Sequence, residues 1–143
     1  MLKNIGGAVA GYIVMFAVVF VGMTLGWLLL GADGALLPGS WDVSMTWSAL
    51  MIVVGLVAAV AGGMVCARVG KDRTAVYLLV GLIVVLGIVS ALPDPGVAET
   101  IRTGDVSMGD AMSTVRPPAW VRWSNPIIGI VGVLFGASRV ARS

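Results

Sequence analysis

Residues that could carry out chemistry are scarce in this sequence of 143 residues. Histidine is absent, and with it the usual metal ligand and the usual proton-transfer group. Cys66 is the single cysteine, so an intrachain disulfide is excluded, and a thiol within an apolar stretch is most simply a small packing residue. The motifs of nucleotide-binding loops, zinc proteases and serine hydrolases do not occur. The sequence therefore predicts no catalytic residue, no cofactor and no enzyme.

Two sparse patterns involve groups that bind cations. Met108 and Met112 resemble a copper(I) spacing, because thioethers are soft ligands. Without a nearby Cys or His, the pair fits the apolar face of a short surface helix better. A ring of carboxylates at one end of a bundle would concentrate cations, and the candidates are Asp33, Asp42, Asp94 and Glu99. Solvated loop carboxylates are the simpler interpretation, so we predict no metal site.

Long uncharged stretches must position these groups. The sequence has 29 uncharged residues between Lys3 and Asp33, 25 between Asp42 and Arg68, 20 between Arg73 and Asp94, and 16 between Arg122 and Arg139. The hydrocarbon core of a bilayer is about 30 Å thick, which a helix of about 20 apolar residues crosses. A mean hydropathy of +1.04 and a charged fraction of 11% are also typical of a membrane protein.

The predicted fold is an all-α integral membrane domain in which four transmembrane helices form an up-down bundle. We expect these helices at about 4–31, 45–69, 72–92 and 119–140, joined between the third and fourth by an outer loop, 93–118. Within that loop, Met108, Ala111, Met112 and Val115 recur at helical intervals, which predicts a short helix on the membrane surface.

The start of the fourth helix has more than one interpretation. A helix that began at Asn125 would be only about 22 Å long, too short to cross the hydrocarbon. We favour a helix that begins near Ala119 and is kinked at Pro126, because this adds two interfacial tryptophans and Arg122. The alternative is a short helix from Asn125 that lies buried among its neighbours. A broken-helix binding point at Asn125 and Pro126, of the kind found in transporters, is less favoured than a helix start there.

The charges predict how these helices are oriented. The predicted loops and termini on one side of the membrane carry a net charge of +5, and those on the other side carry −3. The first side holds Lys3, Arg68, Lys71, Asp72, Arg73, Arg139 and Arg142. Because cytoplasmic loops of membrane proteins are rich in Lys and Arg, we expect a multi-pass protein of the bacterial inner membrane with both termini cytoplasmic. The predicted interface anchors are Trp41, Trp47, Trp120 and Trp123 outside, and Arg68, Lys71 and Arg73 inside.

Small residues recur at a four-residue spacing within the predicted helices. Gly7–Gly11 and Gly22–Gly26 are both GxxxG pairs. Lipid tails are as apolar as leucine, so helices in membranes associate by the close packing that small residues permit. The predicted packing faces consist of Gly7, Ala8, Gly11, Gly22, Gly26, Gly55, Ala59, Gly62, Gly132 and Gly136. The pattern leaves open whether the partners are helices of this chain or of another subunit.

The favoured functional hypothesis is a non-catalytic accessory or scaffold subunit of a larger membrane complex, with respiratory and photosynthetic complexes considered first. It depends on the lack of ionisable groups at depth and on more small-residue surface than such a bundle needs internally. The alternative is a homo-oligomeric transporter or cation channel whose pathway lies between copies. Expected partners are membrane lipids and either other membrane subunits or further copies. Nucleic acid is not expected, because no basic run is interleaved with aromatic residues.

Overall fold

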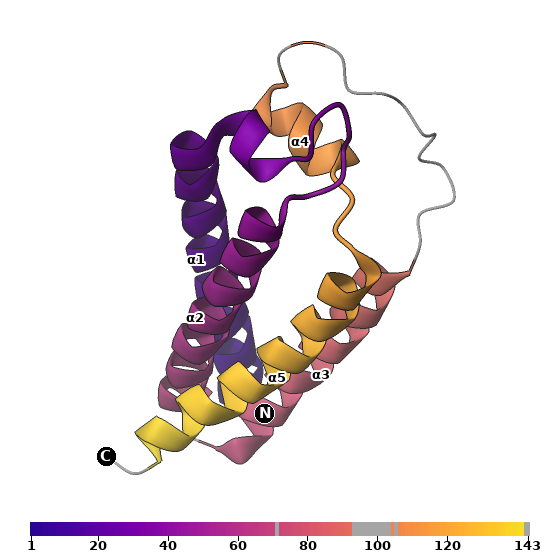
Figure 1. Cartoon of the computed structure of the whole chain (residues 1–143). Coiled ribbons are helices and arrows are strands. Elements are labelled where there is room, and N and C mark those ends of the chain that lie inside the picture. Colours follow the sequence, from indigo (N-terminus) through magenta and orange to yellow (C-terminus); the bar gives the residue numbers. More distant parts are fainter. Residues whose placement is uncertain (71, 93–103, 105, 142–143) are drawn as a thin grey trace.

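The chain is an all-helical, multi-pass membrane protein. The structure is a computed structural model that describes residues 1–70, 72–92, 104 and 106–141 (Figure 1). These residues form five helices and no β-strand: α1 (Leu2–Ala35), α2 (Met45–Gly70), α3 (Arg73–Ala91), α4 (Met108–Thr114) and α5 (Ala119–Val140). Three of them, α1, α2 and α3, are long and apolar enough to cross a membrane.

The first long helix contains a break at Gly31. The sequence predicted that this helix would end there, but α1 continues for one more turn. Gly31 has a φ of 64° and a ψ of −178°, and a positive φ favours glycine because it lacks a Cβ. After the extra turn, Leu36 is extended and its N–H donates to the carbonyl oxygen of Ala32 at 2.9 Å. The break therefore redirects the helix end toward the following hairpin.

A short hairpin joins α1 to α2, where the sequence predicted only a short loop. Leu36 and Val43 pair as an isolated antiparallel bridge, and both side chains are buried. The N–H of Leu37 donates to the carbonyl oxygen of Asp42 at 2.9 Å. These bonds satisfy polar backbone groups of the hairpin that would otherwise lack partners within the protein.

Ser44 fastens the hairpin to both neighbouring helices. Its hydroxyl oxygen accepts from the N–H of Trp47 at 3.1 Å, which is the capping bond expected at a helix start. The same hydroxyl donates to the carbonyl oxygen of Gly34 at 2.7 Å. The N–H of Ser44 also donates to the carbonyl oxygen of Ala35 at 2.8 Å. The end of α1 and the start of α2 are thereby held together.

The short helix α4 covers the hairpin (Figure 1). The Ser107 hydroxyl oxygen accepts from the N–H of Asp110 at 3.2 Å and caps this helix. After α4, the N–H of Arg116 donates to the carbonyl oxygen of Trp41 at 3.0 Å, so the chain is tied to the hairpin just before α5 begins.

The last helix, α5, begins at Ala119 and continues through Pro126. A helix that started at Asn125 is therefore not what forms. The proline ring packs against Gly87 of α3, since a Cβ added at Gly87 would lie 2.5 Å from the proline Cγ. The neighbouring helix thus offers the space that this ring requires.

The long helices run between two ends of the molecule, and the start of α1 and the end of α5 lie at the same end (Figure 1). We call this the terminal end and the opposite one the hairpin end. The terminal-end core joins α1, α2, α3 and α5 through Ala8, Ala59, Cys66, Ala75, Val76, Leu79, Ile83 and Val133. The hairpin-end core is separate and consists of Ala35, Leu36, Val43 and Trp47 with the side chains packed on them.

Candidate functional site

Close packing of α1 on α2 at the terminal end depends on glycine. A Cβ added at Gly7 would lie 2.7 Å from the Cα of Gly70, and one added at Gly11 would lie 2.8 Å from the carbonyl oxygen of Gly62. Gly62 in turn faces Met15 of α1, and Ala8 is buried in the terminal-end core. These predicted packing residues thus meet other helices of their own chain.

The contact of α2 with α5 is closer still. A Cβ added at Gly63 would meet the carbonyl oxygen of Val133, with the Cα of that residue at 2.8 Å. One added at Gly136 would meet the carbonyl oxygen of Val60. Gly132 lies against Ala59, 2.6 Å from its Cβ. Gly63 was not among the predicted packing residues because it lies outside the four-residue register; its position next to Gly62 is the signal that could have marked a second packing face on α2.

The remaining predicted packing residues divide into two groups. Gly22 and Gly26 face α2, where added Cβ atoms would meet Val54 at 2.7 Å and the side chain of Leu50, respectively. A Cβ added at Gly55 would have no heavy atom within 4 Å. Gly55 therefore takes no part in packing between the described helices.

The predicted tryptophan anchors lie in different surroundings. Trp47 is only 7% exposed and packs edge-to-face on Trp27, with ring centroids 5.9 Å apart. Trp41 is half-buried beside the hairpin-end core. Trp120 and Trp123 are exposed, each about half, at the start of α5. These last two present their rings outward, as an interface anchor requires, whereas Trp47 packs within the protein.

The candidate cation-binding residues do not form a cluster in the part of the chain that the structure describes. No group of three or more Cys, Asp or Glu side chains suited to a metal ion occurs among the described residues. Asp42 accepts from the Ser40 hydroxyl at 2.9 Å, and Met112 is 70% exposed. Asp94, Glu99 and Lys71 lie outside the described residues.

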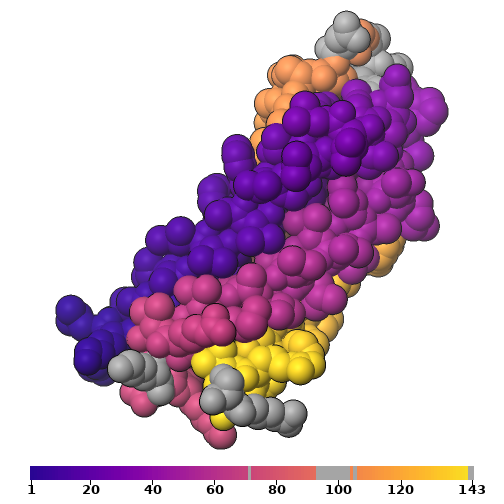
Figure 2. Space-filling model, turned by 90° about the vertical axis from the view of Figure 1, so that its left-hand side faces the viewer, coloured from indigo at the N-terminus to yellow at the C-terminus, as the bar shows by residue number. Residues whose placement is uncertain are grey.

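An apolar groove of about 440 Å³ lies between α1 and α2. Its walls are small or β-branched side chains, namely Ala17, Val18, Val21, Gly22, Val53, Val54 and Val57. The two helices lie side by side along one face of the molecule (Figure 2). The rings of Phe16 and Phe20 on α1 are exposed and stacked, with their centroids 6.3 Å apart. Shallow, apolar and lined by small groups, the groove suits the ridge of another helix.

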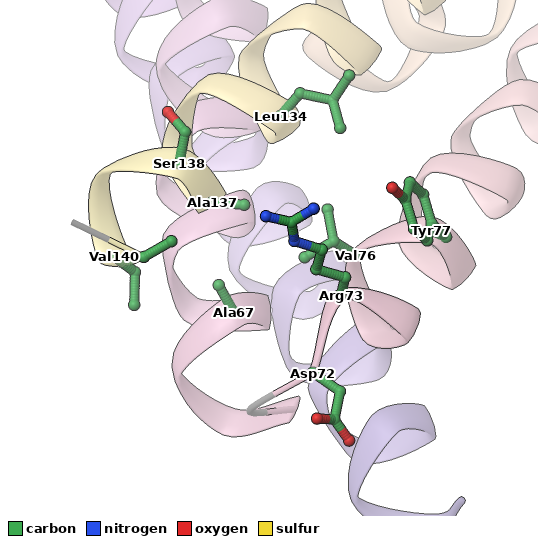
Figure 3. Close-up of a pocket in the computed structure, with 10 residues that line it drawn as sticks. Ala67, Asp72, Arg73, Val76, Tyr77, Leu134, Ala137, Ser138 and Val140 are labelled. Carbon is green, nitrogen blue, oxygen red and sulfur yellow. The ribbon is translucent and has the colours of Figure 1, made fainter.

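A second cavity, of about 620 Å³, opens at the terminal end where α2, α3 and α5 meet (Figure 3). Ala67, Val76, Leu134 and Ala137 line it with apolar surface, and Asp72, Arg73, Tyr77 and Ser138 add polar groups. The guanidinium of Arg73 extends toward α5, whereas the carboxylate of Asp72 points away from α5 (Figure 3). Arg68, at the end of α2, is exposed and does not line the cavity, and Arg139 instead lies 4.7 Å above the ring of Phe135.

No known protein family matches the chain, and comparison with curated proteins and with solved structures finds no similar protein. The chain's own surfaces are therefore what indicates its function.

Proposed function

We propose that this chain is a four-span protein of the bacterial inner membrane that acts as a non-catalytic accessory subunit of a larger membrane assembly, such as a respiratory or photosynthetic complex. The observation that carries the proposal is the apolar groove between α1 and α2. Both helices are long and apolar enough to span a membrane, and the groove is lined by small side chains. The occupant we propose is a transmembrane helix of another subunit.

The fourth crossing is assigned to α5. Its 22 residues would extend about 33 Å at 1.5 Å per residue, enough for the hydrocarbon core. Its early turns hold Arg122, Ser124 and Asn125, which lowers its hydropathy relative to the other long helices. Glycine contacts with α2 along Gly132 and Gly136 support a position inside the bundle. With four crossings, both termini lie on the cytoplasmic side.

This orientation predicts opposite labelling of two exposed serines. In a Cys66→Ala background, a membrane-impermeant thiol reagent applied to spheroplasts should label Ser113→Cys in α4 and leave Ser138→Cys in α5 unlabelled. Everted vesicles should give the reverse pattern, which controls for reactivity. Labelling of both residues in spheroplasts would mean that α5 does not cross.

The assembly role predicts that filling the groove displaces a partner. Val21 lines the groove and Val9 does not, yet both are on α1 and are exposed by 55% and 51%. Overpacking a close contact costs about 1–3 kcal/mol, so Val21→Phe should lower the recovery of co-purifying subunits from native membranes by about fivefold or more. Val9→Phe should leave that recovery unchanged.

The outcomes separate the proposed subunit from the alternative, a homo-oligomeric transporter or channel. Co-purification of other membrane proteins in fixed ratio, lost on Val21→Phe alone, supports an accessory subunit. A homo-oligomer of the chain expressed by itself, dissociated by the same substitution, supports the alternative. A monomer in both preparations contradicts both functions.

A further inference from the structure

We propose that the cavity at the terminal end binds the headgroup of a phospholipid that carries a terminal primary ammonium, the phosphatidylethanolamine class. The inference goes beyond the role as a subunit. It depends on the terminal end of the bundle lying at a membrane surface, as the four-span orientation requires. Leu134, Arg73 and Asp72 follow one another along the cavity toward the end of the bundle, as an apolar, a cationic and an anionic group.

Apolar groups line the inner part of the cavity, and Ala67 and Val140 add apolar surface nearer the end of the bundle (Figure 3). Leu134 is one turn farther into the bundle than Ser138 and is 43% exposed, so an acyl chain can lie along it. Val76 and Ala137 complete this wall (Figure 3). A volume of about 620 Å³ falls within the range of about 300–1,000 Å³ that is usual for small-ligand pockets.

Arg73 supplies the site for the phosphate. Its guanidinium extends into the space between α3 and α5 (Figure 3), and no ion pair or hydrogen bond of this side chain occurs among the residues that the structure describes. A guanidinium fork binds phosphate oxygens with two parallel hydrogen bonds. The Tyr77 hydroxyl is a further donor lining the same cavity.

Asp72 supplies the site for the ammonium. Its carboxylate lies farther toward the end of the bundle than the guanidinium and diverges from it (Figure 3). It does not cap α3 through its side chain, so both oxygens are available as acceptors within the described part of the chain. A phospholipid of this class presents acyl chain, phosphate and ammonium in the same order as Leu134, Arg73 and Asp72. Phosphatidylglycerol presents neutral hydroxyls beyond its phosphate, so it would leave the carboxylate without a cation to pair with.

Lipid retention by the purified full-length protein tests this order. The protein is reconstituted in vesicles with equal parts of phosphatidylethanolamine, phosphatidylglycerol and phosphatidylcholine, and the lipids retained after mild detergent extraction are counted by native mass spectrometry. The wild-type chain should retain phosphatidylethanolamine about fivefold over each of the others, as charge-assisted bonds in a half-open pocket allow. Equal retention, or a preference for phosphatidylglycerol, would overturn the proposal.

Variants separate the two charged groups. Arg73→Gln should abolish the enrichment, and Arg73→Lys, which keeps the charge but not the two parallel hydrogen bonds, should retain only part of it. Asp72→Asn should remove the preference over phosphatidylglycerol while phosphate binding persists. Arg68→Gln is the matched control, because it removes an exposed cation outside the cavity, and it should change nothing. Equal effects of Arg68→Gln and Arg73→Gln would assign the retention to general surface charge.

Two measurements on the unaltered chain hold even if a variant fails to fold. Successive N-methylation of the headgroup removes N–H donors, so retention should fall stepwise from phosphatidylethanolamine to phosphatidylcholine; a flat series would overturn the proposal. Soluble glycerophosphoethanolamine at millimolar concentration should not displace the lipid. Displacement would assign the cavity to a free headgroup instead. Failure of lipid retention with the predicted cysteine labelling intact would refute this inference and leave the four-span orientation standing.

Discussion

Replacing Gly63 by valine should lower the free energy of unfolding by about 3 kcal/mol, at the upper end of what overpacking costs in a close-packed interior. An added Cβ would meet the carbonyl oxygen of Val133 and would lie 2.8 Å from its Cα and 2.9 Å from its carbonyl carbon. These are backbone atoms of α5, so no side-chain rotation can relieve the contact. The two helix axes must move apart, and the packing around Val133, which is fully buried, is lost with them.

The matched control is Gly55→Val on the same helix. Valine has the same intrinsic helix propensity at both positions, but a Cβ at Gly55 would have no heavy atom within 4 Å. Unfolding in mixed detergent micelles, followed by circular dichroism and by size-exclusion chromatography, gives the two free energies. Gly55→Val should change stability by less than about 1 kcal/mol. Similar losses for both variants would mean that the α2–α5 contact is not the cause.

Replacing Trp47 by alanine should cost about 3–5 kcal/mol, the range found for removing a large aromatic side chain from a core. Trp47 is 7% exposed and belongs to the hairpin-end core, where it meets the edge of Trp27 at a centroid distance of 5.9 Å. Its loss would leave a cavity beneath the hairpin, whose Leu36 and Val43 pack in the same core. We therefore expect the hairpin to loosen before the terminal-end core does.

Trp120→Ala provides the comparison, because that ring is 50% exposed at the start of α5. It should destabilise the protein in micelles by less than about 1 kcal/mol, as is usual for surface substitutions that break no packing. Hydrogen exchange of the amides of residues 36–44 should rise in Trp47→Ala and stay unchanged in Trp120→Ala. A stable Trp47→Ala variant with unchanged exchange would show that the hairpin does not depend on this ring.

Hydropathy and charge predict the helices of this protein because both depend only on residues that are close together in the sequence. A continuous uncharged stretch long enough for the hydrocarbon core can satisfy its backbone hydrogen bonds within itself as a helix, and the long helices occur on these stretches. The cap of α4 is equally local, since the Ser107 hydroxyl oxygen accepts from the N–H of Asp110 three residues later. The sequence shows a glycine at position 31, where the helix breaks. It does not predict the extra helical turn after Gly31, because contacts with the hairpin hold that turn in place.

Which face meets which neighbour was decided by the tertiary structure. Gly62, Gly63 and Gly55 are chemically identical and lie on one helix, yet they face α1, α5 and no neighbouring helix, respectively. Trp47 and Trp120 likewise differ only in what packs on them. Most of the small residues that suggested a partner subunit pack against other helices of this chain. The groove near Val21 is the part of that surface that remains exposed. The cavity at Arg73 forms only where α2, α3 and α5 converge. Helical periodicity determines the angle between side chains on one helix, whereas the crossing of two helices depends on every contact between them, and residues distant in sequence supply those contacts.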